Sequence, residues 1–336
     1  MFSFLRASHK YFAIDLGTNN TLVYQPCRGI IFDEPTSILF DSKGSRFFGL
    51  GFLSQKMVGK NPKNIEVLNP LAKGAISNIV VAKAYIKNLI GQISKGSLLK
   101  PDIIVSVPSD LNLMERNAVI EAGKEGGARS VLLLKDPFSA ALGALEDISF
   151  PTGVLVLDIG AGVSEISLLS CNGIVMSKSL RVAGNDIDEA IAEYFKSEKR
   201  ILLSSHDAER LKKELGNVLD TDEKILKVSG KNLLTRLPEV FSISSVDVRK
   251  AILPIIDRIV ALAHSMLSTL PPSFALDIYD NGILLTGGAS MLQGLERYIS
   301  EKLEIAIKPV LNPLQNIILG AGRVMEDKRY NALLSR

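Results

Sequence analysis

The sequence contains no tryptophan and few residues of the types that build disulfide frameworks or zinc sites. Its 336 residues include two cysteines and three histidines. Such sites need several ligands at short, regular spacings, and neither residue type is spaced in that way here. Cys27 and Cys171 each follow an apolar stretch, so we expect two buried free thiols and no disulfide.

Long hydrophobic runs and a strong net charge are also absent. No apolar run approaches the ~18–20 residues that a membrane-spanning helix needs. The apolar stretch at the start is only a few residues long, which is too short for a secretory signal. A net charge of +3 is too small to indicate that the protein binds nucleic acid. We therefore expect a cytoplasmic protein with no nucleic acid partner.

The composition is otherwise typical of a folded, soluble chain. Hydrophobic residues make up 46% of the sequence and charged residues 22%, which is ordinary for globular proteins. The length is sufficient for two domains of usual size.

The most informative stretch is residues 12–24, with the sequence FAIDLGTNNTLVY. A first apolar run leads into Asp15, small polar residues follow from Gly17 to Asn20, and a second apolar run begins at Leu22. This order predicts a strand, a tight turn and a second strand.

A second copy of the pattern lies at residues 153–169, GVLVLDIGAGVSEISLL, where Asp158 and Gly160 match Asp15 and Gly17. In both copies a buried strand ends in a carboxylate, and a turn of small residues then exposes backbone N–H groups. Such turns form concave anion sites, and a carboxylate beside them can hold a hydrated divalent cation. Two facing copies would bind the phosphates of one nucleotide from both sides.

The rest of the chain alternates helix and strand patterns. Residues 77–94 and 112–126 predict helices, and strands at 103–107 and 131–134 flank the second of them, which indicates α/β architecture with a parallel portion of sheet. Short strand-like runs after each hairpin predict a small inserted subdomain in each half of the chain.

Two apolar segments have basic neighbours. Phe2, Phe4 and Leu5 lie near Arg6 and Lys10, and could form one turn of a membrane-surface helix or simply a frayed terminus. Leu98 and Leu99 lie between Lys95 and Lys100, and either pack into the core or form an exposed apolar tip that enters a lipid headgroup layer.

Eight segments together resemble a known superfamily. They are IDLGTNNTLVY near the start, Asp33-Glu34-Pro35, VPSDLNLMERNAVIEAGKEGGAR at 107–129, KDPFSAALGA at 135–144, DIGAGVSEIS at 158–167, VAGNDIDEAI at 182–191, AERLKKELG at 208–216 and LLTGGASMLQGL at 284–295. Their order and spacing resemble the ATPases related to actin, sugar kinases and heat-shock chaperones, and most closely the MreB family of bacterial actin homologues. The resemblance runs from near residue 1 to about 325.

The resemblance implies an α/β, actin-like duplicated ATPase fold with two domains flanking a nucleotide cleft. The first half would span residues 1–150, with an inserted subdomain at about 32–70, and would be completed by residues 309–336. The second half would span residues 151–308, with an inserted subdomain at about 185–245.

Carried over residue by residue, the resemblance implies ATP and Mg²⁺ as cofactors. Asp15 and Asp158 would hold Mg²⁺, largely through water. The nucleotide-binding positions would be Gly17, Thr18, Asn19, Asn20, Gly160, Ala161, Gly162, Val163, Glu209, Arg210, Leu211, Lys212, Gly287, Gly288, Ala289 and Ser290. The physical reading agrees at Gly287 and Gly288, because a Gly-Gly turn lets backbone approach a ligand and a helix beginning directly after it favours an anion. On spacing alone, Glu209 and Lys212 would be read as a solvated helix face.

The same resemblance assigns Asp136 and Ser164 to catalysis, and here the sequence departs from the family pattern. Asp136 stands where the family has a Glu that orients the attacking water, and Ser164 stands where it has a Thr. Lys135, Val163 and Ala289 also differ from the usual residues. A carboxylate that is one methylene shorter could miss the water by roughly 1 Å, which can cost about 10²-fold in rate. We expect retained nucleotide binding and slow hydrolysis.

The expected function is that of an ATP-binding cytoskeletal protein that polymerises into filaments and supports cell shape by organising cell-wall synthesis. Its implied partners are further copies of itself, the inner membrane surface, and membrane proteins of cell-wall elongation and shape determination. It would lie in the cytoplasm, peripheral to the inner face of the membrane. The alternatives are a specialised paralogue that uses ATP as a switch with little hydrolysis, a small-molecule kinase, and a chaperone ATPase. The kinase and chaperone readings are disfavoured, because we find no acceptor-site base and no substrate domain after residue 330.

Overall fold

The computed structural model describes residues 10–41, 47–95, 99–219 and 222–335 and divides into two compact units. Unit 1 comprises Met1–Thr152, Leu168–Ser177 and Leu314–Arg336, and unit 2 comprises Gly153–Ser167 and Lys178–Pro313. The chain thus leaves unit 1 two residues after the sequence-based boundary and returns five residues after it. No sequence pattern had indicated that Leu168–Ser177 belongs with unit 1.

Unit 1 is built on a five-stranded sheet with the order β10-β9-β1-β2-β3. Its strands are β1 (Tyr11–Leu16), β2 (Asn20–Gln25), β3 (Gly29–Pro35), β9 (Asp102–Val107) and β10 (Ser130–Lys135). The first hairpins run antiparallel, whereas β1, β9 and β10 run parallel. The carboxyl ends of the three parallel strands therefore meet at one edge of the sheet, the edge at which Asp15 lies.

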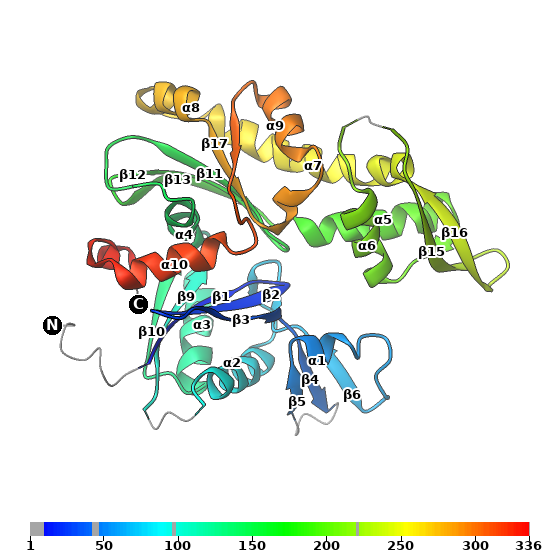
Figure 1. The fold of residues 1–336 in the computed structure, drawn as a ribbon, viewed down its shortest axis with the longest axis horizontal. Helices are drawn as coiled ribbons and strands as arrows, with labels where there is room; N and C mark the ends of the chain where they lie inside the picture. Colours follow the sequence, from blue (N-terminus) through cyan, green and yellow to red (C-terminus); the bar gives the residue numbers. More distant parts are fainter. Residues whose placement is uncertain (1–9, 42–46, 96–98, 220–221, 336) are drawn as a thin grey trace. The chain divides into compact units, whose positions relative to one another are not determined.

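Helices cover both faces of this sheet (Figure 1). The helices α2 (Ile79–Ile93) and α3 (Leu113–Glu125) pack on one face, and α4 (Asp136–Gly143) and α10 (Asn316–Glu326) pack on the other. Successive strand residues point to opposite faces, so that Phe12, Ile14 and Leu16 reach the core under α2 and α3.

The start of each covering helix follows from its sequence. The side chain of Asn78 accepts hydrogen bonds from the first turn of α2, and Asn112 and Glu115 form a reciprocal capping box at α3. These caps satisfy backbone N–H groups that have no partner inside the helix. Both helices were predicted from the sequence, α2 from its apolar periodicity, and both are confirmed.

The helix α10 returns to unit 1 by close backbone contact with α4. A Cβ atom added to Gly320 would lie 1.8 Å from the carbonyl oxygen of Ser139, so only glycine fits there. The Asn316 side-chain amide donates to the Ala140 carbonyl at 2.8 Å, and Arg323 donates to the Leu142 carbonyl at 2.7 Å. These two bonds tie α10 to the last turn of α4.

A second five-stranded sheet repeats the same topology in the order β13-β12-β11-β17-β18, and residues Leu168–Ser177 of β12, β13 and their connection belong to unit 1. Its strands are β11 (Val154–Ile159), β12 (Ser164–Ser170), β13 (Gly173–Leu180), β17 (Ile283–Thr286) and β18 (Ile307–Pro309). The β11 strand pairs in parallel with β17, and β17 with β18. The duplicated hairpins of the sequence therefore occupy equivalent places in two sheets of equal strand order.

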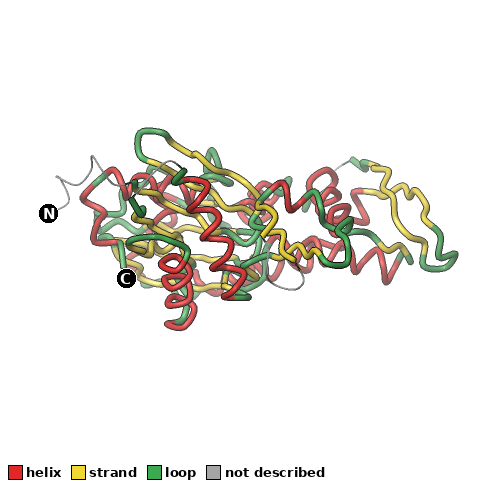
Figure 2. The backbone as a smooth tube through the Cα atoms, turned by 90° about the horizontal axis from the view of Figure 1, so that it is seen from below, coloured by secondary structure: helices red, strands yellow, loops and turns green. Residues whose placement is uncertain are grey.

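Smaller elements are inserted in both units. Unit 1 contains a sheet of order β5-β4-β6 (Phe47–Leu50, Ile38–Asp41, Ile65–Leu68) with α1 (Phe52–Gln55), and a hairpin of β7 (Leu71–Ala72) and β8 (Ala75–Ile76). Unit 2 contains α5 (Gly184–Glu198), α6 (Ser205–Leu215), α7 (Ser245–Leu267), α8 (Ala275–Asn281), α9 (Leu295–Leu303), and β14 (Ile201–Leu202), β15 (Ile225–Asn232) and β16 (Pro238–Ser244). Figure 2 shows β15 and β16 as an antiparallel pair of strands joined by a loop.

The burial expected for the two cysteines is wrong. Both thiols are free, but both residues are exposed. Each occupies a hairpin connection with a positive φ, 64° at Cys27 and 50° at Cys171. The apolar residues before them belong to the strands β2 and β12, and the chain has already left the core when it reaches the sulfur atoms.

The described residues include no single helix long and apolar enough to cross a membrane. The segments Ser245–Leu267 and Pro272–Asn281 together have the length and apolar composition of a membrane-spanning segment, but the pair is bent by 107°.

An ion pair between the buried carboxylate of Asp102 and the exposed Arg129 lies at the amino end of the parallel strands and generates a prediction about stability. Asp102 is 5% exposed, and it accepts hydrogen bonds from both Arg129 and Ser130. Burial alone would raise the pKa of Asp102, but the hydrogen bonds and charge of Arg129 and the hydroxyl of Ser130 outweigh it, so that this pKa is lowered. The native state therefore favours the ionised carboxylate.

We predict that Asp102→Asn lowers the free energy of unfolding of unit 1 by about 1–3 kcal/mol at neutral pH. Because the folded pKa lies below the unfolded value of about 3.9, the stabilisation is complete above that pH and is lost as the pH falls through the folded pKa. Hydrogen exchange of the β9 and β10 amides at several pH values measures it. The exposed Glu66→Gln change is the control. A difference in the free energy of unfolding between the native and Asp102→Asn chains that does not shrink in acid would contradict the prediction.

Candidate functional site

The first predicted turn follows β1 and is tight. Gly17 comes so close to Asn20 that an added Cβ atom would lie 2.6 Å from the Asn20 carbonyl oxygen. Asp15 is in register with Ser106 of β9, which is in register with Leu134 of β10. The turn therefore projects from the edge at which the parallel strands end, where α/β folds commonly bind ligands.

Two hydrogen bonds from other parts of unit 1 hold this turn in place. The Thr36 N–H donates to the Asn19 carbonyl at 2.7 Å, and the Gly74 N–H donates to Thr18 Oγ1 at 3.1 Å. In a trans peptide the carbonyl and the following N–H point in opposite directions, so the Asn20 N–H points away from Thr36. Thr18 accepts through its oxygen, which leaves the hydroxyl proton able to donate.

The carboxylate before this turn is in an unfavourable electrostatic setting. Burial, with the negative charge of Asp33 as the smaller cause, raises the pKa of Asp15 to about 7. A cation close to such a carboxylate favours its ionised form.

The second turn follows β11 and is held by the start of α5. Gly160 N–H donates to the Val163 carbonyl at 2.9 Å, which closes the turn on itself. The Gly184 and Asn185 N–H groups donate to the carbonyls of Gly160 and Ala161 at 3.1 and 2.8 Å. Because these carbonyls point at α5, the N–H groups of Ala161 and Gly162 point away from it. Successive N–H groups aimed one way form an anion-binding concavity.

A glycine packs directly against the second carboxylate. Gly287 has a φ of 87°, and an added Cβ atom would lie 2.3 Å from Asp158 Oδ1 and 2.3 Å from the Ile159 carbonyl oxygen. Asp158 is in register with Thr286, the last residue of β17. The predicted Gly-Gly turn and the predicted metal ligand are therefore neighbours in unit 2.

The prediction of a helix directly after Gly288 is wrong. Gly288–Met291 forms a short 3-10 helix, and the α-helix α9 begins only at Leu295. Met291 at the end of the 3-10 helix is 60% exposed. The predicted α-helix N-terminus that would favour an anion therefore does not lie at this turn. Ser290 Oγ instead donates to the Gly287 carbonyl at 2.6 Å and holds the turn in shape.

The two residues predicted for catalysis differ in what their side chains do. Asp136 is the first residue of α4, half-buried, at the carboxyl end of β10. Ser164 is fully buried and its hydroxyl donates to the Val182 carbonyl at 2.7 Å. Since that bond uses the only proton of the hydroxyl, Ser164 can offer further partners only its acceptor lone pairs.

The predicted positions on α6 are engaged in local contacts. Glu209 pairs with Lys213 at 2.7 Å, Arg210 pairs with Glu214 at 2.8 Å, and Leu211 is fully buried. Lys212 reaches α5, where its ammonium pairs with Asp188 at 2.7 Å and donates to the Gly184 carbonyl at 3.0 Å. Lys212 thereby braces the same helix start that holds the second turn.

Of the predicted membrane contacts, Phe2, Phe4, Leu5 and Leu98 lie outside the described residues. Leu99 is described and is 43% exposed, with exposed Lys95 and Lys100 on either side in the sequence.

Sequence reasoning missed the groups that support the turns. Gly184 and Asn185 were quoted as part of a motif but were given no role, and Thr36 and Gly74 were not singled out. The usable signal was a Gly-Asn pair at a strand-to-helix junction, where unpaired N–H groups are expected.

Each of the two turns follows a single carboxylate, Asp15 in unit 1 and Asp158 in unit 2. No three His, Cys, Asp or Glu side chains gather into a metal-binding group among the residues with described positions. Mg²⁺ usually keeps several waters and takes one or two carboxylates together with phosphate oxygens, and Asp15 and Asp158 are carboxylates of that kind.

Comparison with known proteins gives one family. The model of the MreB/Mbl protein family matches residues 9–332. The cell shape-determining protein MreB of Escherichia coli (strain K12) is 34% identical over 321 residues, which cover 94% of this chain and 92% of that protein. The cell shape-determining protein Mbl of Bacillus subtilis (strain 168) is 31% identical over 316 residues, or 94% and 95% of the two chains.

A solved structure of MreB5 of Spiroplasma citri bound to ADP has the same fold. Its TM-score with this chain is 0.91 at 29% identity, over 96% of this chain and 98% of that one. The resemblance predicted from the motifs, and the α/β actin-like fold that it implied, are therefore confirmed. The chain belongs to the MreB/Mbl family, and it is an MreB-like cytoskeletal protein with an actin-like fold.

Proposed function

We propose that the chain binds ATP with Mg²⁺ through its two turns, and that the bound nucleotide controls self-assembly into filaments. One observation carries this proposal. In each turn a backbone carbonyl accepts a hydrogen bond from behind, from Thr36 in unit 1 and from Gly184 and Asn185 in unit 2. The N–H groups that follow are thereby oriented for an anion before any ligand binds, which lowers the cost of ordering the site on binding.

Related structures support the choice of nucleotide. MreB5 of Spiroplasma citri, 29% identical, has been solved with ADP and with AMPPNP. Adenine nucleotides of both phosphate lengths therefore bind a protein of this fold. We assign the phosphates to residues 17–20 and 160–163, and the nucleoside to α6 and to residues 287–290.

In the proposed complex Asp15 and Asp158 hold Mg²⁺ through its water ligands. The ion supplies charge neutralisation on the phosphates. The raised pKa of Asp15 marks a carboxylate whose ionised form gains from a nearby cation.

We assign Asp136 the role of orienting the attacking water, with slow turnover. Its place at the first position of α4 fixes the backbone, so that only two rotatable side-chain bonds set the reach of the carboxylate. Ser164 acts through its lone pairs alone, because its proton is held by Val182.

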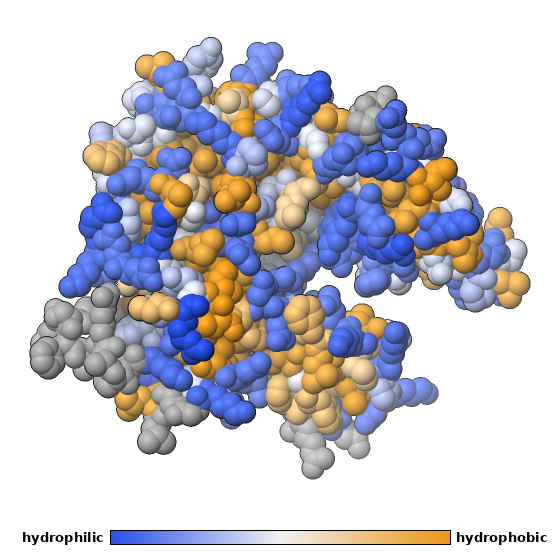
Figure 3. Space-filling model, in the orientation of Figure 1, coloured by the Kyte–Doolittle hydropathy of each residue, from blue (hydrophilic) through white to orange (hydrophobic). Residues whose placement is uncertain are grey.

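Self-assembly is supported by an exposed apolar surface on the small inserted sheet of unit 1. Phe47, Phe48, Phe52 and Leu53 are between 39% and 57% exposed, and hydrophobic side chains gather over this part of the molecule in Figure 3. Three of these side chains, with Glu34, Asn88 and Gln92, line a cavity of about 460 Å³. Exposed apolar clusters of this kind commonly mark protein contacts, and we assign this one to a second copy of the chain.

We further propose peripheral binding to the inner face of the membrane, through residues 1–8 and through Leu98 and Leu99. The exposed Leu99 beside exposed lysines fits an anionic headgroup layer. One such anchor is weak, but a filament repeats it many times and gains affinity by avidity. In this position the filament could organise the membrane proteins of cell-wall elongation.

The first prediction from the proposed function concerns metal-dependent binding. Asp15→Asn and Asp158→Asn should each weaken ATP binding in Mg²⁺ at least about tenfold, and should change binding in EDTA little. Titration calorimetry with monomeric protein measures both conditions. The exposed Glu66→Gln and Asp280→Asn changes serve as controls in units 1 and 2. Tight, magnesium-dependent binding by the double Asp15/Asp158 variant would refute the site.

The second prediction concerns turnover. Asp136→Ala should slow phosphate release at least about tenfold, and Asp136→Glu should raise it above the native rate because the longer side chain recovers about 1 Å of reach. Phosphate release under saturating ATP and Mg²⁺ is the measurement, with Glu66→Gln again as control. Equal rates in all three chains would remove Asp136 from the mechanism. A native rate near zero would favour the ATP switch over the ATPase.

The third prediction concerns filaments on membranes. Negative-stain microscopy should show filaments on anionic vesicles with ATP and Mg²⁺. A chain that lacks residues 1–8 and carries Leu98→Ser and Leu99→Ser should lose vesicle co-sedimentation while still forming filaments in solution. Leu202→Ser is the matched control, because Leu202 is 44% exposed and Leu99 is 43% exposed. Unchanged pelleting of the truncated variant would reject the anchors.

A further inference from the structure

A buried tyrosine of α2 lies behind the first turn, and no role has been assigned to it. Tyr85 is 0% exposed, and its ring belongs to the hydrophobic core of unit 1. Its hydroxyl is therefore a polar group without access to water, and a group of this kind is expected to have hydrogen-bond partners inside the protein.

The Tyr85 hydroxyl lies beside two threonines at the end of the turn. Thr21 directly follows Asn20, and the Thr36 N–H donates to the Asn19 carbonyl at 2.7 Å. The Oγ1 atoms of Thr21 and Thr36 are 2.8 Å apart and share one hydrogen bond. Burial raises the pKa of Tyr85, although the neighbouring Thr21 and Thr36 hydroxyls lower it. The three side chains thus form a buried hydroxyl cluster in which the tyrosine keeps its proton.

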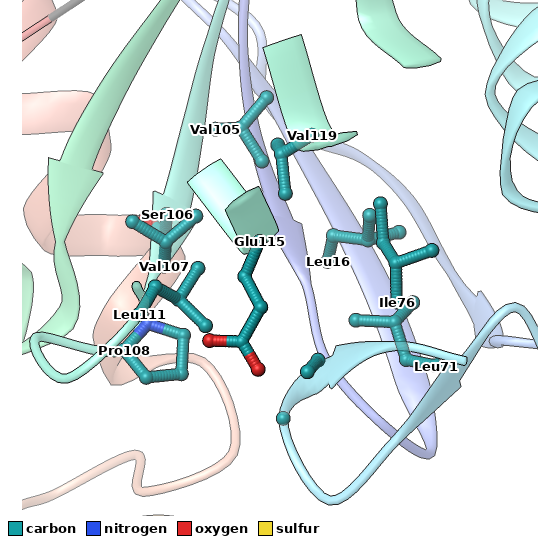
Figure 4. A pocket seen from close by; sticks show the side chains of 12 residues that line it. Leu16, Leu71, Ile76, Val105, Ser106, Val107, Pro108, Leu111, Glu115 and Val119 are labelled. Atoms are coloured by element: carbon teal, nitrogen blue, oxygen red, sulfur yellow. The ribbon is translucent and has the colours of Figure 1, made fainter. Parts of the chain in front are cut away.

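The start of the turn is fixed in a different way. The side chain of Leu16 meets those of Leu71 and Ile76 around a small cavity (Figure 4). These contacts are apolar, so they hold the strand end in place but do not orient a peptide group. The direction of the peptide between Asn19 and Asn20, whose N–H would face an anion, therefore depends on the polar contacts at the end of the turn.

The hydroxyl cluster is incompletely hydrogen-bonded. The bond between Thr21 and Thr36 uses one of its hydroxyl protons, and the Tyr85 oxygen has no hydrogen bond of ordinary geometry to any other residue that the structure describes. A buried hydroxyl in this condition raises the free energy of the state in which it occurs. Each hydroxyl can donate one hydrogen bond and accept others, so the three could satisfy one another in a closed ring.

The cluster and the turn cannot move independently. Thr21 is the next residue after Asn20, and Thr36 is hydrogen-bonded to Asn19, so a shift of the turn changes the distances among the three hydroxyls. Hydrogen bonds weaken steeply with poor distance and angle, so a small shift is enough to close or open the ring. The state of the cluster therefore depends on the state of the turn.

We propose that Tyr85 is a positioning residue for the first turn. When an anion binds at residues 17–20, the turn settles so that the Tyr85 hydroxyl closes the ring with Thr21 and Thr36, and the hydrogen bonds gained there contribute to binding. The inference rests on the proposed nucleotide binding. The effect acts on the turn as a whole and not on one phosphate, so the affinities for ATP and ADP change alike.

The test uses Tyr85→Phe in the full chain, which removes the hydroxyl and keeps the ring in the core. The free variant should melt at the native temperature or above it, because a buried hydroxyl without a hydrogen bond is lost. Its affinities for ATP and ADP in Mg²⁺ should each fall about tenfold, as measured by titration calorimetry with monomeric protein. Tyr279→Phe is the control, because Tyr279 lies in unit 2 and is 75% exposed.

A second variant tests whether the hydroxyls act as one cluster. Thr21→Val should also weaken ATP binding, and the addition of Tyr85→Phe should then weaken it by less than about twofold, because the ring is already broken. Effects of the two changes that simply multiply would overturn the cluster.

The remaining outcomes separate this inference from the proposed function. A melting temperature of Tyr85→Phe below the native value, or an unchanged affinity for both nucleotides, overturns the role of Tyr85 while the proposed nucleotide site stands. Failure of the native chain to bind either nucleotide overturns the proposed function and this inference with it.

Discussion

One constraint acts at both turns: hydrogen bonds from residues outside the turn fix the direction in which its carbonyl groups point. Gly160 and Ala161 present their carbonyls to the start of α5, and Asn19 presents its carbonyl to Thr36. A planar trans peptide cannot turn its carbonyl one way without turning the next N–H the other way. The direction in which each turn can bind an anion is therefore set by residues outside the turn.

The two turns share a sequence pattern and sheet topology, but they are supported by different elements. The second turn is held by α5, and α5 in turn is braced by Lys212 of α6, which pairs with Asp188 and the Gly184 carbonyl. The first turn is held by Thr36 before β4 and by the tip of the β7–β8 hairpin. The β7–β8 hairpin is thus one hydrogen bond from the first turn, and α6 reaches the second turn through α5.

The sequence was sufficient where local patterns decide structure. Apolar periodicity predicted α2, and strand-carboxylate-glycine order predicted both hairpins, because these depend on neighbours within a few residues. Prediction from the sequence failed where contacts between distant residues decide the structure. Cys27 and Cys171 are exposed because hairpin connections turn the chain outward, and Met291 lies in a short 3-10 helix before α9 begins. The partners of the turns were likewise missed, since Gly160 and Gly184 meet only in the folded unit.

The way in which the turns are built explains why binding and turnover need not change together. In the proposed complex, phosphates are bound by backbone N–H groups, which require glycine where space is short, as at Gly17, and otherwise tolerate other side chains. On that proposal, Val163 in place of the usual residue leaves the backbone contact intact. Water orientation would instead depend on the length of one carboxylate at Asp136 and on one hydroxyl at Ser164, whose proton Val182 already holds. In the proposed mechanism the departures from the family pattern therefore fall mainly on turnover, so that the nucleotide is retained for longer before it is hydrolysed.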